Sequence, residues 1–79
     1  MEASARPRER FRVLRAQRGG YDAIMFDVQL QVVSTGALVW AQSFSDEQQA
    51  DDFYTTVSTD LDTLEMADFR SKYGVPSTT

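Results

Sequence analysis

The sequence predicts an α+β fold in which a three-stranded antiparallel β-meander is packed on one face by a C-terminal helix, with a short second helix after it. Apolar and polar residues alternate over residues 24 to 32, which is typical of a half-buried strand. Glycine-containing turns divide the first half of the chain, and apolar residues recur at helical spacing after residue 45. The expected order of elements is β-β-β-α-α, in a single domain over residues 9 to 75.

The two ends of the chain are expected to lie outside this domain. Residues 1 to 8 combine small, charged and proline residues without periodicity, which predicts a flexible arm containing arginine. The packed part begins with the alternation around Phe11 and Val13, which predicts the first strand. Residues 76 to 79 begin with a proline that cannot continue a helix, and they are expected to form a frayed tail.

The first two strands are expected to form a tight hairpin. The pair Gly19-Gly20 supplies the positive φ angles that such a turn needs. The second strand is the clearest element in the chain, because apolar residues occupy every second position: Ile24, Phe26, Val28, Leu30 and Val32.

The second hairpin is expected to close at Ser34, Thr35 and Gly36, a three-residue loop with glycine in the left-handed position. A shift of the pairing by one residue would turn Trp40 toward the polar face, so burial favours one register. That register pairs residues across the second and third strands as Val33 with Ala37, Val32 with Leu38, Leu30 with Trp40 and Phe26 with Phe44.

Helical spacing begins after the third strand. Ser45 is expected to cap the first turn, with Gln48 reaching back to it in a capping box. The apolar stripe that would dock on the sheet consists of Ala50, Phe53, Tyr54, Val57, Leu61 and Leu64. The later apolar residues lie on a different face, so we expect a break near residues 62 to 65 and a second helix that ends at Gly74.

The composition excludes several classes of site. The chain of 79 residues contains no Cys and no His, which excludes disulfides, thiolate metal sites and a cysteine nucleophile, and removes the commonest general base. Phosphate-binding and calcium-loop spacings are missing. The acids Asp46, Glu47, Asp51 and Asp52 fit helix-end electrostatics better than a metal site. We therefore expect a protein that is not an enzyme and that binds no cofactor or metal.

The expected location is the cytoplasm. No apolar run approaches the roughly 20 residues of a membrane span, so no membrane association is expected. The first residues lack the apolar region of a secretory signal. A chain without cysteine is also compatible with a reducing compartment.

The second face of the predicted sheet is expected to be open, because one helical layer covers only the first face. Residues on or near it would form a shallow patch for a protein partner or a second copy of the chain: Tyr21, Met25, Val33 and Val39. Scattered surface hydrophobes are also normal, so a solvated face is the alternative. We expect a small non-catalytic interaction or accessory module that acts through this face or through the edge strands. Self-association as a homodimer is one form of this hypothesis.

Arginine is concentrated at the start of the chain, where residues 1 to 20 carry six Arg and two Glu. Clustered guanidinium groups bind phosphates, so the alternative function is a nucleic-acid or polyanion binder that uses Arg6, Arg8, Arg10, Arg12, Arg15 and Arg18. The competing interpretation is that these residues form the solvated face of an edge strand, or dock on the acidic helix. The rest of the chain carries ten acids against Arg70 and Lys72, a balance that would repel a phosphate backbone.

A third interpretation is a regulatory subunit that lends its acidic helix to a basic partner. Charge reversal at Asp51 and Asp52 would distinguish it from the other two. No motif in the chain is specific enough to indicate a family, so the sequence does not choose among these functions.

Overall fold

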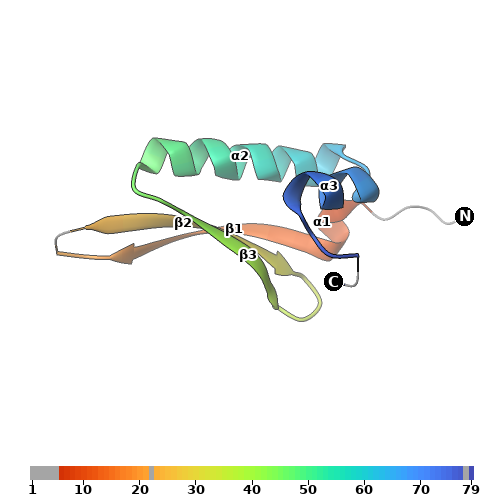
Figure 1. Ribbon diagram of the computed structural model, residues 1–79, viewed down its shortest axis with the longest axis horizontal. Helices are drawn as coiled ribbons and strands as arrows, with labels where there is room; N and C mark the ends of the chain where they lie inside the picture. The colour runs from red at the N-terminus through yellow and green to blue at the C-terminus, as the bar shows by residue number, and fades with distance from the viewer. Residues whose placement is uncertain (1–5, 22, 78) are drawn as a thin grey trace, which may run out of the picture.

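The computed structural model describes residues 6–21, 23–77 and 79. Along them the chain forms these elements in order: α1 (Pro7–Arg10), β1 (Phe11–Gly19), β2 (Ile24–Val32), β3 (Leu38–Phe44), α2 (Glu47–Thr63) and α3 (Met66–Tyr73). The strands form one antiparallel sheet in the order β1-β2-β3, and α2 lies along one face of it (Figure 1). The predicted α+β meander with two C-terminal helices is confirmed.

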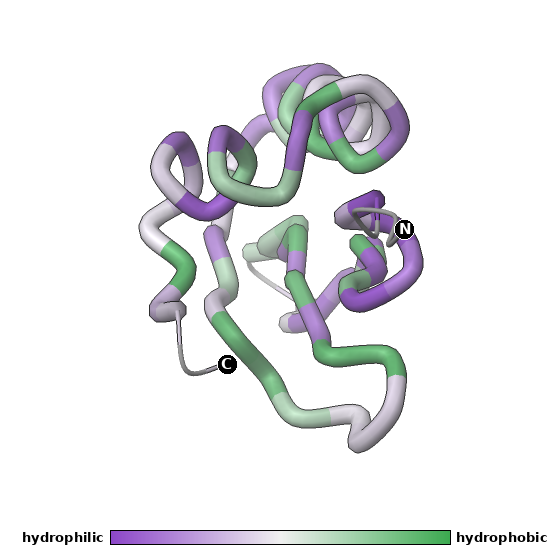
Figure 2. The backbone as a smooth tube through the Cα atoms, turned by 90° about the vertical axis from the view of Figure 1, so that its right-hand side faces the viewer, coloured by the Kyte–Doolittle hydropathy of each residue, from purple (hydrophilic) through white to green (hydrophobic). Residues whose placement is uncertain are grey.

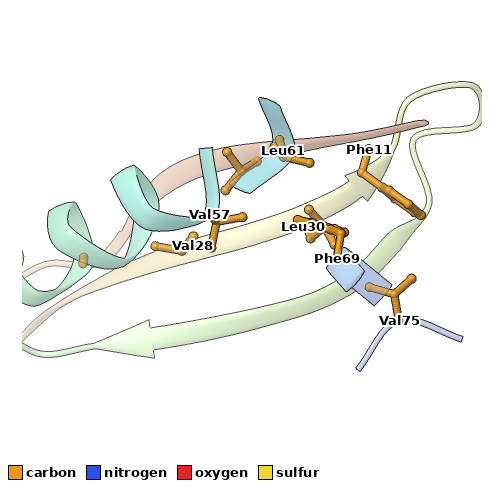
Figure 3. Packing of buried hydrophobic residues seen from close by; sticks show 9 residues of the cluster. Phe11, Val28, Leu30, Val57, Leu61, Phe69 and Val75 are labelled. Atoms are coloured by element: carbon orange, nitrogen blue, oxygen red, sulfur yellow. The ribbon is translucent and has the colours of Figure 1, made fainter. Parts of the chain in front are cut away.

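The core lies between the sheet and the two long helices, which occupy one side of the strands (Figure 2). Val57 of α2 lies over Val28 of β2, and both side chains are fully buried (Figure 3). Phe69 of α3 stacks on Phe11 at the start of β1, with 5.9 Å between the ring centroids. Each such side chain contributes about 1.5–3 kcal/mol through burial. The core therefore holds α3 against the sheet as well as α2.

The pairing of β2 with β3 follows the prediction at one end and departs from it at the other. Phe26 faces Phe44 and Leu30 faces Trp40, as expected, but Leu38 faces Gln31 instead of Val32. Ala37 accepts a hydrogen bond from the Val32 N–H at 2.8 Å, so the predicted pairing of Ala37 with Val33 is wrong. The loop is one residue longer than expected, and a β-bulge at Val39 restores the register that keeps Trp40 on the core face.

The helix boundaries confirm the predicted break and correct the predicted cap. The Asp46 side chain, and not Ser45, caps α2, because its carboxylate accepts a hydrogen bond from the Gln48 N–H at 3.2 Å. A carboxylate is well placed at the positive end of a helix. The segment between α2 and α3 contains Leu64 and Glu65, and α3 ends at Gly74 in the left-handed conformation with φ of 63°.

The described parts of both chain ends are packed against the domain. Pro7 is buried at the first position of α1, where its fixed φ suits a helix, so the predicted flexible arm does not extend to residues 7 and 8. The Thr79 carbonyl accepts hydrogen bonds from Arg70 at 3.1 Å and from Arg10 at 3.4 Å, which anchor a tail predicted to fray. Residues 1–5 and residue 78 lie outside the described residues.

The β1–β2 hairpin is longer than the rest of the sheet. Pairing with β3 ends at Phe26, whereas pairing with β1 continues to Ile24. The tip of this hairpin therefore extends beyond the start of α2 (Figure 1). No helix among the described residues has the length and apolar character needed to cross a bilayer.

Candidate functional site

A groove with a volume of about 630 Å³ runs along the outer edge of β3, between this strand and the helices. This volume is within the usual range of about 300–1,000 Å³ for ligand pockets. Four consecutive residues of β3 line the groove, and neighbouring residues of a strand point to opposite faces. The groove therefore follows the strand edge itself. Its lining consists of Val39, Trp40, Ala41, Gln42, Phe53, Thr56, Lys72, Tyr73 and Gly74.

The backbone of β3 presents hydrogen-bonding groups toward this groove. The Val32 N–H bonds to Ala37 on the β3 side at 2.8 Å, and the Val33 N–H bonds to Arg10 on the β1 side at 2.9 Å. Because these directions alternate along a strand, the even-numbered residues of β2 bond to the residues opposite them on β3, which are Trp40, Gln42 and Phe44. Ala41 and Ser43 consequently direct their N–H and C=O groups outward. In the sheet as described, β3 has no neighbour on that side.

Aromatic side chains form the floor of the groove. Trp40 lies 5.7 Å from Phe53 and 6.1 Å from Tyr73, measured between ring centroids. The indole N–H of Trp40 is buried and has no acceptor among the residues that the structure describes. An unpaired buried donor costs about 1–3 kcal/mol. The floor therefore combines an apolar surface with one donor that is left unpaired.

A three-residue network ties the wall formed by α3 to α2. The Asp60 carboxylate accepts hydrogen bonds from Lys72 at 2.7 Å and from the Tyr73 hydroxyl at 2.5 Å. Burial acts to raise the pKa of Asp60, but the hydrogen bonds from Lys72 and Tyr73 outweigh it and lower this pKa. Burial and the neighbouring Asp60 raise the pKa of Tyr73 above its ordinary value. At neutral pH, Tyr73 is therefore a neutral donor, and Asp60 balances the charge of Lys72.

The residues predicted to form an apolar patch do not lie together. Met25 lies near the start of β2 and Val33 directly follows its end, roughly 26 Å away at the usual rise per residue. Tyr21 is fully exposed at the tip of the β1–β2 hairpin. Val39 lies at the bulge and packs partly against the core beside the groove. Of the four predicted residues, only Val39 belongs to the groove.

The open face of the sheet carries a polar network that joins all three strands. Asp27 is only 5% exposed, and it accepts hydrogen bonds from Arg18 at 2.6 Å and from Ser43 at 2.7 Å. The hydrogen bonds from Arg18 and Ser43 lower the pKa of Asp27, although burial opposes them. Because these charged and polar side chains lie on the open face, this face is less suited to bind an apolar partner than the sequence predicts.

The arginine residues proposed to bind polyanions each contact another residue of the same chain. Four of them pair with side-chain carboxylates and two bond to other oxygens, and most of these partners lie in helices and strands. The contacts join Arg6 to Glu65, Arg8 to Asp62 and the Ser58 carbonyl, Arg10 to the Thr79 carbonyl, Arg12 to Gln31, Arg15 to Asp51, and Arg18 to Asp27. The predicted docking of arginine on the acidic helix therefore applies to Arg8 and Arg15.

Two of the acids at the start of α2 contact a backbone N–H or an arginine. Asp46 caps the helix and Glu47 lies 4.0 Å from Arg15, as expected for helix-end electrostatics. Across the part of the chain that the structure describes, no three acidic side chains gather in an arrangement that could hold a metal ion.

The sequence pattern predicts a core position for Trp40 and Phe53, where sheet and helix meet, and it does not predict a groove beside them. A signal for the site was nevertheless present, because no charged residue occurs from Leu38 to Phe44. Edge strands usually carry charges that prevent further pairing.

No protein-family model, curated protein or solved structure matches this chain. What the protein does must therefore be inferred from the geometry of its own residues.

Proposed function

We propose that the protein is a non-catalytic interaction module that binds an extended segment of a partner polypeptide along the edge of β3. The observation that carries this proposal is the position of the outward backbone groups of Ala41 and Ser43 beside an aromatic groove. An extended segment that joins a free sheet edge gains main-chain hydrogen bonds from the strand. Its alternate side chains gain specificity from the pocket next to that strand.

The composition of β3 supports this mode of binding. The strand carries no charge from Leu38 to Phe44, so nothing repels a second strand at this edge. An apolar side chain of the bound segment would cover Trp40, Phe53 and Tyr73.

The expected affinity is modest. The groove spans four residues of β3, which corresponds to roughly 13 Å of an extended segment. Such a segment buries less than the roughly 1,200 Å² at the lower end of stable interfaces. Micromolar dissociation constants are therefore expected, as for transient complexes.

The cytoplasm remains the expected compartment, because a chain without cysteine suits a reducing environment.

Selection from a library of random nine-residue peptides displayed on phage would test the proposal. Peptides enriched on the wild-type protein are expected to bind Ala41→Val and to lose at least tenfold in affinity for Ala41→Pro. Proline removes the outward N–H at position 41 and is tolerated at a sheet edge, whereas valine keeps this donor. Amide exchange of the wild-type complex is expected to show new protection at Ala41 and Ser43.

A second variant keeps the test valid if Ala41→Pro does not fold. Thr56→Trp places a large side chain in the groove without changing the backbone of β3, and it is expected to block the same peptides. The proposal is wrong if no peptide is enriched, or if the enriched peptides bind all variants equally. It is also wrong if sedimentation shows a dimer at micromolar concentration that excludes the peptides, because the edge would then serve a second copy.

The polyanion alternative gains no support from the arginine contacts. Its test is binding to heparin or single-stranded DNA, which should weaken steeply with salt if the alternative is correct. Absent or salt-independent binding rejects it.

A further inference from the structure

The acids of α2 differ in how they are neutralised on the two sides of the helix. On the side of β1 and α1, Asp51 pairs with Arg15 and Asp62 pairs with Arg8. On the side of the groove, Asp60 pairs with Lys72. Asp52 accepts a hydrogen bond from Gln48 at 2.9 Å, and no cation within the described residues pairs with it. One carboxylate of α2 is thus left without a counter-charge.

Asp52 lies one helical turn before Thr56, a residue of the groove lining. Thr56 lines the groove, and its hydroxyl donates a hydrogen bond to the Asp52 carbonyl one helical turn earlier, at 2.9 Å. Side chains four residues apart on a helix are neighbours, about 5–6 Å apart between their Cβ atoms. Among the described residues, Lys72 is the only charged residue that lines the groove, and Asp60 balances it. The Asp52 carboxylate, one turn from the lining, is therefore the nearby charge of α2 for which the described residues supply no cation.

The position of Asp52 along the groove follows from the chain path. β3 leads into α2 through Ser45 and Asp46, so α2 begins beside the Phe44 end of β3 and runs back along the strand (Figure 1). Asp52 thus lies nearer this end than Thr56. On a bound strand, side chains on the same face repeat every two residues, about 6.6 Å apart. This spacing is close to the rise of about 6 Å that separates Thr56 from Asp52 along α2.

We propose that the segment bound along β3 is basic and carries a lysine or arginine two residues from the apolar side chain that fills the groove. The apolar side chain covers Trp40 and Tyr73, and the cation two residues away pairs with Asp52. This inference rests on the proposed function and specifies the chemistry of its partner. The partner is a polypeptide with alternating apolar and basic residues in extended conformation.

The peptides enriched on the wild-type protein would test the inference. One enriched peptide would be made in three versions. They differ at two positions, two residues before and two residues after the apolar residue, where they carry lysine, threonine or glutamate. Affinities are measured by fluorescence anisotropy at 20 mM and 500 mM NaCl. The lysine version is expected to bind about threefold more tightly than the threonine version at low salt, and the glutamate version more weakly than both, because an exposed ion pair contributes only modestly to affinity. High salt is expected to reduce both differences.

The role of Asp52 is tested with a matched variant. Asp52→Asn is expected to remove most of the preference for lysine and to leave the affinity for the threonine version unchanged. Glu9→Gln changes the net charge equally at an exposed position of α1, beside β1, and it is expected to keep the preference.

Equal affinities for the lysine and glutamate versions, or a preference that survives Asp52→Asn, overturn the inference about charge. Binding of the threonine version that is lost in Ala41→Pro still supports the interaction module in that case. The two proposals can therefore fail separately.

Discussion

The two edges of the sheet differ in how open they are to another strand. β1 forms one edge and carries Arg12, Arg15 and Arg18, whereas β3 forms the other and has no charged residue from Leu38 to Phe44. The arginine residues of β1 bond to Gln31, Asp51 and Asp27, which fixes them along that edge. Charged side chains discourage edge-to-edge pairing. The same sheet thus has one protected edge and one receptive edge.

The difference between the edges extends into the layer below them. Phe11, the first residue of β1, is fully buried and stacks on Phe69. Trp40 of β3 is only partly buried and lines the groove. Side chains beneath the protected edge therefore complete the core, while those beneath the receptive edge remain in part available to a ligand. Substitutions at the two positions should separate stability from binding.

The largest effect is expected from Phe11→Ala, since truncating a buried phenylalanine typically costs about 3–5 kcal/mol of unfolding free energy. Trp40→Phe keeps an aromatic ring and removes the unpaired indole N–H, so its cost is expected to be about 1 kcal/mol or less. Urea unfolding of both variants measures these costs. The comparison fails if Trp40→Phe destabilises the protein as much as Phe11→Ala does.

A second comparison uses the pH dependence of stability. The pKa of Asp27 is lowered in the folded protein, chiefly by the hydrogen bond from Arg18 of β1 and then by that from Ser43 of β3. An acid with a lowered pKa stabilises the fold above its unfolded pKa, about 3.9, and this contribution is lost as the pH falls through the lowered value.

Asp27→Asn is therefore expected to be less stable than the wild type at pH 7, with the difference shrinking below about pH 4. Urea midpoints at pH 7, 5 and 3 measure this difference. A difference that stays constant over this range would show that the Asp27 charge does not contribute. Asp60→Asn provides the matched comparison at the groove, because the Asp60 pKa is also lowered, by Lys72 and Tyr73 against the effect of burial.

The sequence predicted the elements well because local patterns determine them. The alternation from Ile24 to Val32 matches β2 at both ends, and the loss of helical phase after Leu64 matches the break between α2 and α3. The bulge at Val39 was missed, because the length of the preceding loop and the burial of Trp40 together decide the register. Neither quantity can be read from the strand pattern alone.

The candidate site was harder to predict than the fold. The groove exists because α3 turns back and places Tyr73 beside Trp40, 33 residues earlier in the chain. Phe69 of α3 also stacks on Phe11, 58 residues earlier, and the periodicity of the sequence does not predict such a long-range contact. The arginine residues were equally ambiguous, because a spacing in sequence does not reveal which acid each guanidinium meets.

The smallest expected effects separate two adjacent acids of α2. Asp51 pairs with Arg15 of the protected edge, with both side chains partly exposed, so Asp51→Asn is expected to cost about 0.5 kcal/mol or less at low salt. Screening should reduce this cost at 500 mM NaCl. Asp52 has no such partner among the described residues, so Asp52→Asn is expected to leave the unfolding free energy unchanged. Thermal unfolding of both variants at two salt concentrations measures the difference. If Asp52→Asn proves the more destabilising of the two, then Asp52 supports the helix itself, and its carboxylate is not held available for a cation on the groove side.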